Sequence, residues 1–482
     1  MHASLPLACI PKSRANTVKA GLAARPDPVM TAVLGRLAAL IHGWPRARLL
    51  VALSGGVDSL VLLHALVQLR RQLRPRGRLK LRAVHIDHHL QAASGEWRTH
   101  CERVARGWRV SLTVCDADIV LRRGDSLEAV ARAARYAQLA NTLRPGELLL
   151  TAQHQDDQLE TVLLQLLRGA GPAGLAAMPE SAPFGAGHLL RPLLAVSRHD
   201  ISHYAKANTL RWIEDPSNSD LRFDRNYLRA RVLPALLERW PSAAVTVSRS
   251  ARHLAEAQAL VAELAAVDLA AVAESQTLSL GRLARLPPMR QRATLRLWLQ
   301  QRGCSTPDTR HLARILNELP AARSDANPLV RWPGGEVRRY QGLLFCVKPS
   351  PPSIGGSWEW RRGRAFALGL GWGSLRVVAD ANGPWPRSAL PERLIVAFRT
   401  GGERVAVGGQ HRSLKELYRD AKVLPWMRQH IPIVSSAAEL WCVPGLWSHA
   451  APADARASRA GRIAIQWQDA PLWCCPRGPQ AS

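Results

Sequence analysis

A short segment near the start of the chain constrains the fold more than any other part. Residues 49–59 read LLVALSGGVDS, an apolar run that ends in two glycines flanked by serines and an aspartate. Residues 60–66 are then apolar at helical spacing, so a strand, a tight turn and a helix follow one another directly. Such a turn aims backbone N–H groups and the positive end of the helix at one point, which favours a bound phosphate. Glycine lets the backbone approach that anion without an intervening Cβ.

The glycine turn differs from two widespread phosphate-binding loops. It lacks the Gly-Lys-Ser/Thr of a Walker A loop, and it does not match G-x-G-x-x-G. A plain strand-to-helix turn would not need two serines and an aspartate around its glycines. Ser-Gly-Gly-x-Asp-Ser resembles the pyrophosphate loop (PP-loop) of enzymes that cleave ATP to AMP and pyrophosphate. The resemblance implies an ATP site and leaves the second substrate open. The loop residues expected to bind ATP are Ser54, Gly55, Gly56, Val57, Asp58 and Ser59.

Strand and helix patterns alternate from about residue 48 to residue 167. We expect strands at 49–53, 79–87, 110–114 and 147–153, and helices at 59–74, 95–106, 126–143 and 156–168. This alternation predicts an α/β domain with a doubly wound, Rossmann-like parallel sheet, as in PP-loop and adenine nucleotide hydrolase-like proteins. Ligands of such sheets bind beyond the carboxyl ends of the strands. The polar segments 54–59, 85–89 and 153–157 are all expected there.

The remaining chain divides by composition. Beyond residue 241 it is rich in Ala, Leu and Arg with helical periodicity, and a later stretch reads PSPPSIGG. Residues 1–29 are basic, which fits an extension or a misassigned start with Met30 as the alternative. The expected parts are a first domain over 30–240, a mainly helical domain over 241–348, a linker over 349–357, a small α+β domain over 358–468 and a tail over 469–482.

The charge of the chain points to a polyanionic partner. Its 482 residues carry a formal net charge of +28, and nucleic acid is the leading candidate. A GC-rich coding sequence would explain Arg in place of Lys but not the scarcity of acids. The eight cysteines include no Cys-x-x-Cys pair, which gives little support to a zinc ribbon or an iron–sulfur cluster. No apolar run is long enough to span a membrane, and we expect a cytoplasmic protein.

The second strong motif is HQDDQLET at residues 154–161. Asp157 and Glu160 are three residues apart and so share one face of the expected helix. Asp156 and Asp157 fall in its first turn, where negative charge is favourable, so helix capping is the simpler interpretation of the acids. Capping does not require His154 in front of them. Carboxylates beside an ATP site suit either Mg²⁺ or a substrate ammonium, and the sequence leaves open which acid serves which.

Three further groups are candidates for substrate contact. Ile86 and His88 end the second strand and are expected to border the nucleotide. Arg132 and Arg135 lie three apart on a helix, where a solvated surface and a phosphate contact are both compatible with the pattern. Residues 223–231, FDRNYLRAR, form a basic helix start whose simpler interpretation is again a solvated face.

Taken in order, these motifs resemble one family, tRNA(Ile)-lysidine synthase. The resemblance extends to RTGGER at 399–404, LKEL at 414–417 and LPWMR at 424–428, which look like the C-terminal tRNA-binding module of that family. It spans about residues 45 to 450, and the middle domain matches least specifically. The other matching segments are 54–59, 86–88, 132–136, 154–161, 191–194, 215–218 and 225–231.

The resemblance implies an ATP- and Mg²⁺-dependent ligase. Its substrates would be free L-lysine and an isoleucine tRNA with a CAU anticodon, whose wobble cytidine becomes lysidine. The cytosine C2 carbonyl oxygen would attack the α-phosphate of ATP and release pyrophosphate. The lysine amine would then attack C2 and displace AMP. The product decodes AUA instead of AUG and is charged with isoleucine instead of methionine.

The resemblance also implies residue roles. The middle and C-terminal domains would bind tRNA, and the sequence leaves a homodimer open. The implied catalytic residues are Asp58, Arg135, His154, Asp157 and Glu160, with Asp58 and Asp157 as Mg²⁺ ligands. The implied lysine or tRNA contacts are Asp157, Glu160, Arg132, Arg225, Asn226, Arg229, Arg404, Lys415 and Arg428.

Two other kinds of protein are weighed against this family. The first is a tRNA thiolase or another adenylating tRNA-modifying enzyme of the same superfamily. A cluster-dependent thiolase would need Cys-x-x-Cys pairs, and an amidotransferase would need a glutaminase domain, for which the sequence offers no candidate. The second is a non-catalytic RNA-binding protein. It would account for the charge but leave the glycine turn and the acids unexplained.

Overall fold

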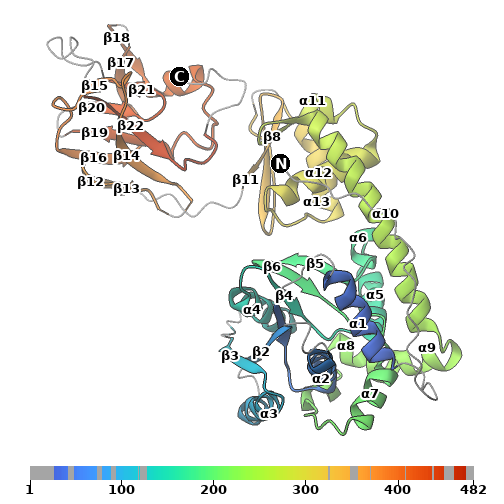
Figure 1. The fold of residues 1–482 in the computed structure, drawn as a ribbon. Helices are drawn as coiled ribbons and strands as arrows, with labels where there is room; N and C mark the ends of the chain where they lie inside the picture. Colours follow the sequence, from blue (N-terminus) through green and yellow to red (C-terminus); the bar gives the residue numbers. More distant parts are fainter. Residues whose placement is uncertain are drawn as a thin grey trace, which may run out of the picture. The chain divides into compact units, whose positions relative to one another are not determined.

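The computed structural model divides the chain into two compact units, Met1–Ala259 and Leu260–Ser482 (Figure 1). Most of the expected extension and linker and the end of the tail lie outside the described residues, as does His88. None of the helices in the described part is long and apolar enough to cross a membrane. The structure describes residues 27–41, 48–72, 79–87, 94–117, 119, 127–323, 326–347, 356–369, 371–407, 409–436, 439–449 and 461–473.

The first unit is built on a six-stranded sheet with the order β3-β2-β1-β4-β6-β5. Every pair is parallel except β5 with β6, so the predicted parallel α/β sheet is confirmed, with one antiparallel edge strand added. The strands are β1 Arg48–Ala52, β2 Lys80–Asp87, β3 Ser111–Asp116, β4 Glu147–Leu150, β5 Ser181–Phe184 and β6 Gly187–Leu190.

Helices cover both faces of this sheet. Successive residues of a strand point to opposite faces, and β1 is buried on both. Leu49 and Val51 pack into the core that includes α2, whereas Leu50 packs with Leu139 of α4 on the other side. The helices are α1 Pro28–Ile41, α2 Val57–Gln72, α3 Ser94–Gly107, α4 Leu127–Thr142, α5 Gln155–Leu167, α6 Pro172–Leu175, α7 Arg198–Ala207, η1 Pro216–Ser219, α8 Asp224–Tyr227, the π-helix η2 Leu228–Val232 and α9 Leu233–Arg239.

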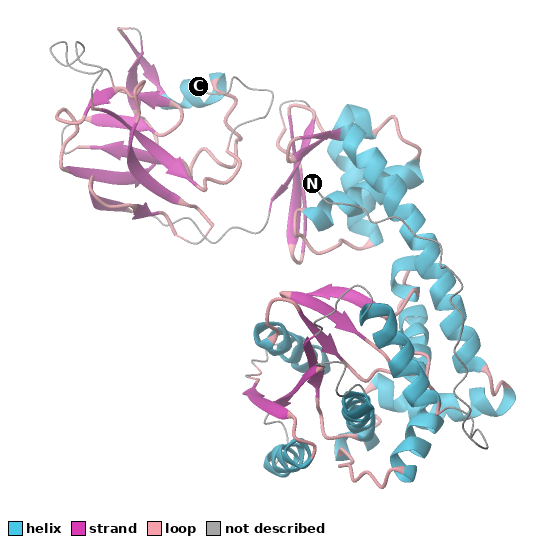
Figure 2. Ribbon diagram, viewed as in Figure 1, coloured by secondary structure: helices cyan, strands magenta, loops and turns pink. Residues whose placement is uncertain are grey.

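The long helix α10, Ala243–Val272, leads into the second unit, whose first part is mainly helical as predicted. Its helices pack on a five-stranded antiparallel sheet that the sequence did not predict (Figure 2). The strands are short, and two of them have three residues or fewer. The elements are β7 Ala273–Glu274, β8 Thr277–Ser279, α11 Leu280–Leu283, α12 Pro288–Gln301, α13 Thr309–Ala321, β9 Leu329–Trp332, β10 Gly335–Tyr340 and β11 Leu343–Val347.

The C-terminal part of the second unit is richer in strand than an even α+β mixture (Figure 2). Five-, four- and two-stranded sheets accompany α14, which Ser413 caps by accepting the N–H of Glu416. The ring of Trp426 lies 5.3 Å from that of Phe345, so this part shares an apolar core with β11. The elements are β12 Ser357–Arg361, β13 Phe366–Ala367, β14 Ser374–Ala379, β15 Trp385–Pro386, β16 Arg393–Phe398, β17 Arg404–Val407, β18 Gln410–Ser413, α14 Leu414–Asp420, β19 Pro432–Ser435, β20 Leu440–Val443, β21 Trp447–Ser448 and β22 Arg462–Gln468.

Candidate active site

The glycine turn joins β1 to α2 and is shaped by its own hydrogen bonds. The Ser59 hydroxyl donates to the Gly56 carbonyl at 3.0 Å and accepts the Ser54 N–H at 3.2 Å. Gly55 has φ +88°, a conformation that L side chains rarely adopt. A Cβ at Gly55 would also lie 3.3 Å from the Cys101 Sγ. The turn is therefore preorganised, with the N-terminus of a 16-residue helix directly behind it.

A cavity of about 940 Å³ opens beside the turn, at the carboxyl ends of β1 and β2. This size is typical of small-molecule sites, and the place is the one expected for ligands of a parallel sheet. Residues 212–219 form part of its lining. The predicted site residues that line it are Ser54, Gly56, Val57, Asp58, Ile86, Arg135, His154 and Arg229.

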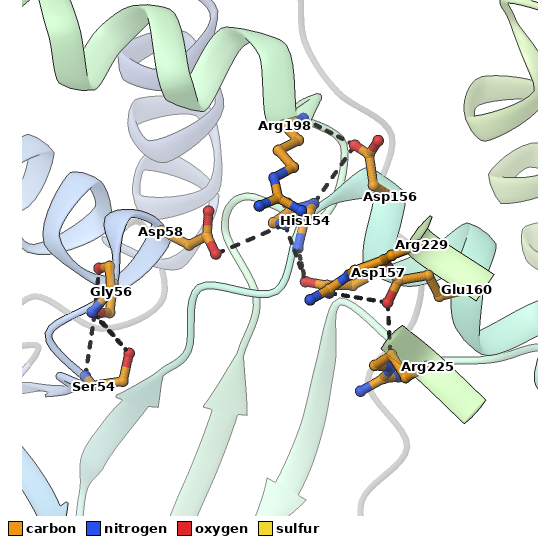
Figure 3. Close-up of polar contacts among 11 residues, drawn as sticks. Ser54, Gly56, Asp58, His154, Asp156, Asp157, Glu160, Arg198, Arg225 and Arg229 are labelled. Carbon is orange, nitrogen blue, oxygen red and sulfur yellow. Dashed lines mark hydrogen bonds and ion pairs between the residues drawn. The ribbon is translucent and has the colours of Figure 1, made fainter. Parts of the chain in front are cut away.

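His154 lies among three carboxylates and links the turn to α5 (Figure 3). Its Nε2 is 3.9 Å from the Asp58 Oδ2 and 3.5 Å from the Asp157 Oδ2, and its Nδ1 is 3.6 Å from the Asp156 Oδ2. The imidazole is only 2% exposed. The backbone N–H of His154 also donates to the Asp157 Oδ2 at 3.0 Å, so the acid caps α5 as well. Capping and clustering, which the sequence posed as alternatives, occur together.

The electrostatics of the cluster favour a charged imidazole. Burial opposes a charge on His154, but the carboxylates of Asp156, Asp157 and Asp58 outweigh it and raise its pKa. Burial raises the pKa of Asp58 despite the attraction of His154. For Asp156, burial is outweighed by hydrogen bonds from His154 and from the Arg198 N–H, and its pKa is lowered.

Asp58, Asp156, Asp157 and Glu160 are here called the acid cluster. Two arginines pair with Asp157 and Glu160 of this cluster (Figure 3). The Arg229 Nη2 is 2.9 Å from the Asp157 Oδ1 and 3.0 Å from the Glu160 Oε2, and its Nε donates to the Glu160 Oε1. The Arg225 Nε lies 3.2 Å from the Glu160 Oε2. Glu160 is 1% exposed, and burial raises its pKa although Arg229 opposes the shift. In this structure Glu160 therefore pairs with both Arg225 and Arg229. Asp157 pairs with Arg229 and remains 15% exposed beside His154.

The other predicted contact residues lie outside the cavity lining. Arg132 is exposed, with its guanidinium 5.0 Å from the centre of the Tyr136 ring. Asn226 is buried and donates to backbone carbonyls.

The remaining three predicted contacts belong to the second unit. Arg404 and Lys415 are exposed, on β17 and α14. Arg428 is half-buried and donates from Nε to the Val423 carbonyl at 3.2 Å.

The sequence did not single out several residues that line the cavity. Arg198 begins α7, and its N–H donates to the Asp156 Oδ2 at 2.9 Å. Trp97 and Trp212 contribute half-buried aromatic surface. The sequence predicts a helix around residues 198–208, and α7 begins there with Ser197 accepting the Asp200 N–H, but the pattern gave Arg198 no role in the site. No local pattern distinguishes the two tryptophans from core residues.

The described residues contain no group of three or more His, Cys, Asp or Glu side chains arranged to hold a metal ion. Magnesium needs no such cage, because it is commonly held by one or two carboxylates together with substrate phosphates. Among the described residues, the Asp58 Oδ1 is buried and has no hydrogen-bond partner. One carboxylate oxygen beside the turn is thus available for such an ion.

The fold and the site together define a class, the PP-loop ATP-binding enzymes. Residues 30–236 match the family model described as the PP-loop domain. Residues 278–345 match the TilS substrate binding domain, and residues 394–467 match the TilS substrate C-terminal domain. A PP-loop domain implies ATP binding, as expected from the sequence.

Curated relatives specify the family. The tRNA(Ile)-lysidine synthase of Methylococcus capsulatus is 43% identical over 402 residues, which cover 82% of this chain and 90% of that protein. The same-named proteins of Pseudomonas aeruginosa and Coxiella burnetii are 42% and 39% identical, over 82% of this chain and 90% and 88% of theirs. The chain belongs to the tRNA(Ile)-lysidine synthase family and is a ligase, as the resemblance predicted. These matches do not favour a thiolase or a non-catalytic RNA-binding protein.

Proposed function

We propose that the protein ligates L-lysine to C2 of the wobble cytidine of tRNA(Ile) with a CAU anticodon, forming lysidine at the expense of ATP. One observation carries the proposal at this site: Asp58 of the PP-loop and His154 both line the cavity and lie 3.9 Å apart, and His154 in turn lies 3.5 Å from Asp157, which is outside the lining. A phosphate cradle and a place for an ammonium group are thereby adjacent. The two-step reaction needs both.

In the proposed first step, the cytosine C2 carbonyl oxygen attacks the α-phosphate of ATP. A C–O–P bond forms, the bond to the β-phosphate breaks, and pyrophosphate leaves toward the turn. Negative charge develops around the phosphates, and Arg135 and Arg198 from the cavity lining are the cations available to stabilise it. The target base must leave its stack to reach a cavity, which suits an unpaired anticodon position.

In the proposed second step, the lysine ammonium group loses a proton to a carboxylate or to solvent, and the free amine attacks C2. A C–N bond forms, the bond between C2 and the adenylated oxygen breaks, and AMP leaves with that oxygen. The amine arrives as an ammonium ion and requires a carboxylate that still has accessible surface. Glu160 is 1% exposed and pairs with two arginines, whereas Asp157 pairs with only one of them, Arg229, and is 15% exposed. We therefore propose that Asp157 is the acid closest to lysine and that Glu160 fixes Arg225 and Arg229.

Magnesium, when bound, would supply positive charge to the phosphates of ATP. Asp58 fits this role because its buried Oδ1 lacks a partner among the described residues and it lies beside the turn. The second unit supplies exposed cations, such as Arg404 and Lys415, for the phosphates of the tRNA.

We also propose the domain boundaries given under Sequence analysis. We further propose that the protein acts in the cytoplasm, where ATP, lysine and tRNA occur together.

The proposal is tested with purified protein, ATP, Mg²⁺, labelled lysine and unmodified tRNA(Ile) with a CAU anticodon. We expect label in the tRNA fraction and one pyrophosphate released per lysine incorporated. A methionine tRNA, which shares the anticodon, and the isoleucine tRNA with its wobble cytidine replaced are the controls. Label that stays out of a competent tRNA, with folded protein, contradicts the proposal. Pyrophosphate release without lysine transfer would instead indicate another adenylating enzyme.

A further inference from the structure

We propose that Asn226 is a positioning residue that holds one wall of the ATP cavity and does not contact substrate. The wall is defined as residues 213–219, all of which line the cavity. This differs from the role expected from the sequence, which placed Asn226 among the lysine or tRNA contacts. The inference rests on the proposed function, because it requires ATP to occupy this cavity.

The first end of the wall is attached to the PP-loop itself. The Ile213 N–H donates to the Gly55 carbonyl at 3.1 Å. The chain then turns through η1, where the Asp215 Oδ1 accepts the Ser217 N–H at 2.8 Å. The wall is thus anchored at Ile213, where it contacts the PP-loop. Its other end, at η1, needs a separate support.

Asn226 supplies that support from the neighbouring helix α8. Its side-chain Nδ2 donates to the Ser217 carbonyl at 2.7 Å and to the Asp220 carbonyl at 3.0 Å. Both amide protons are used in this way, and the residue is 9% exposed and absent from the cavity lining. The carboxamide therefore has no remaining donor to offer a substrate. It fixes the backbone within η1, at Ser217, and directly after η1, at Asp220.

The helical segment around Asn226 carries the two arginines that pair with the acid cluster, Arg225 on α8 and Arg229 on the π-helix η2. Arg225 precedes Asn226 and Arg229 follows it, and both contact Glu160 (Figure 3). A closed circuit of contacts results, here called the site circuit. It runs from Gly55 through the wall to Asn226, along the helix to Arg229, and back through Asp157, His154 and Asp58 to the PP-loop.

Loss of the Asn226 amide opens this circuit at one point. The wall would no longer be held at Ser217 and Asp220, although every residue that lines the cavity would still be present. A displaced wall lowers the affinity for ATP because part of the binding energy is then spent on ordering it. Lysine and tRNA, if they bind elsewhere in the site, should be affected much less.

The test measures ATP binding to the full chain, without tRNA, by calorimetric titration. We expect Asn226→Ala to raise the Kd for ATP by at least about fivefold, the effect of losing two buried hydrogen bonds. Asn226→Asp keeps the size of the side chain but replaces the amide donor by an oxygen facing two carbonyls. It should weaken ATP binding at least as much. Asn226→Gln retains the donor and should bind ATP more tightly than Asn226→Asp.

Gln291 offers a matched control. Its Nε2 donates to the Ala284 carbonyl at 3.4 Å and the Leu286 carbonyl at 2.8 Å, the same kind of two-carbonyl clamp in the second unit. Gln291→Ala should lower Tm but leave the Kd for ATP within about twofold of the wild-type value. In turnover assays, Asn226→Ala should raise the KM for ATP while the KM for lysine stays within about twofold.

Three outcomes would overturn the inference. The first is equal ATP affinity in wild type, Asn226→Ala and Asn226→Asp. The second is a raised KM for lysine or tRNA with ATP binding unchanged, which would restore the role as a substrate contact. The third is equal ATP affinity in Asn226→Gln and Asn226→Asp, which would remove the amide donor as the cause. A wild-type protein that does not bind ATP would instead refute the proposed function.

Discussion

His154 is the residue on which the charge balance of the site depends. It is buried between Asp58 of the turn and the acids that open α5, and its pKa is raised because those carboxylates outweigh the cost of burial. Sequence reasoning found this residue because a histidine directly ahead of a capped acidic helix is unusual. It could not find that Glu160 is enclosed by arginines, because residues 160 and 229 meet only in the folded chain.

The raised pKa of His154 predicts a pH-dependent contribution to stability. The imidazolium ion is stabilised in the folded protein, so the contribution is complete below the ordinary value of 6.5 and is lost as the pH rises through the higher folded value. In EDTA, the difference in unfolding free energy between wild type and His154→Gln should be largest below pH 6.5 and shrink as the pH rises above that value. A constant difference for His154→Gln across these pH values would contradict the charged state.

Replacing Asp157 tests the proposed lysine contact. Asp157→Ala should lower lysine transfer by about 100-fold or more, since a site charge that balances the ammonium is lost. Glu318→Gln, which removes an exposed carboxylate that pairs with Arg314, is the control and should retain full activity. Near wild-type transfer by Asp157→Ala would reject the role.

At the scale of elements, the connection from β1 to α2 determines where the phosphate can bind. The positive φ of Gly55 and the 3.3 Å between a Cβ there and the Cys101 Sγ of α3 disfavour a side chain at this position. The largest difference from the sequence prediction is the helix after the wall. The structure divides it into α8, a π-helical turn and α9. Pro234 in the first turn of α9 has no backbone N–H to donate to a carbonyl of the preceding turn. This missing donor is compatible with the irregular hydrogen bonding there.

Gly55→Ala is expected to impair ATP binding. Holding alanine at positive φ costs about 1–2 kcal/mol, and the new Cβ meets the Cys101 Sγ at 3.3 Å. The affinity for ATP should fall by about tenfold. Adding Cys101→Ala would relieve the contact but not the backbone strain, so recovery should be partial. Gly107→Ala, where a Cβ meets nothing within 4 Å, is the control. Unchanged affinity in Gly55→Ala would show that the turn is not the phosphate cradle.

Periodicity predicted most elements of the first unit, because buried parallel strands and amphipathic helices leave regular apolar patterns. The strand expected at 79–87 is β2, and the helix expected at 156–168 is α5, each within about two residues. The sheet of the middle part escaped prediction because β7 and β8 are too short to show alternation. The role of the wall could not be predicted from the sequence. The Ile213 N–H donates to the carbonyl of Gly55, which is distant in sequence, and the Asn226 side chain donates to a backbone carbonyl of the wall, which leaves no sequence pattern.

At the scale of the whole molecule, the proposed catalytic site and the proposed C-terminal tRNA-binding domain belong to different units. The first unit contains the complete site circuit, and the second contains Arg404 and Lys415 on exposed surfaces. Truncation would be a poor test of this division, because the packing of Trp426 on Phe345 means that it would uncover apolar side chains. Charge substitutions leave that packing intact.

Arg404→Ala combined with Lys415→Ala should weaken tRNA binding without changing ATP binding. Each lost phosphate contact should reduce the slope of log K against log salt by about 1. Filter binding across a series of salt concentrations measures the slope, and ATP titration provides the comparison. Arg314→Ala, on an exposed helix with a paired acid, is a matched control for loss of positive charge. An unchanged salt slope in the double variant would exclude these two residues from the tRNA interface.

The site circuit also sets when, during synthesis, the protein acquires its ATP site. The PP-loop leaves the ribosome about 170 residues before Asn226 and Arg229, an interval of roughly 9–34 s at ordinary elongation rates. Until those residues emerge, the wall lacks the hydrogen bonds from Asn226, and Asp157 and Glu160 lack Arg229. A nascent chain stalled before α8 should therefore retain ATP poorly, although every residue of the nucleotide loop has already been made.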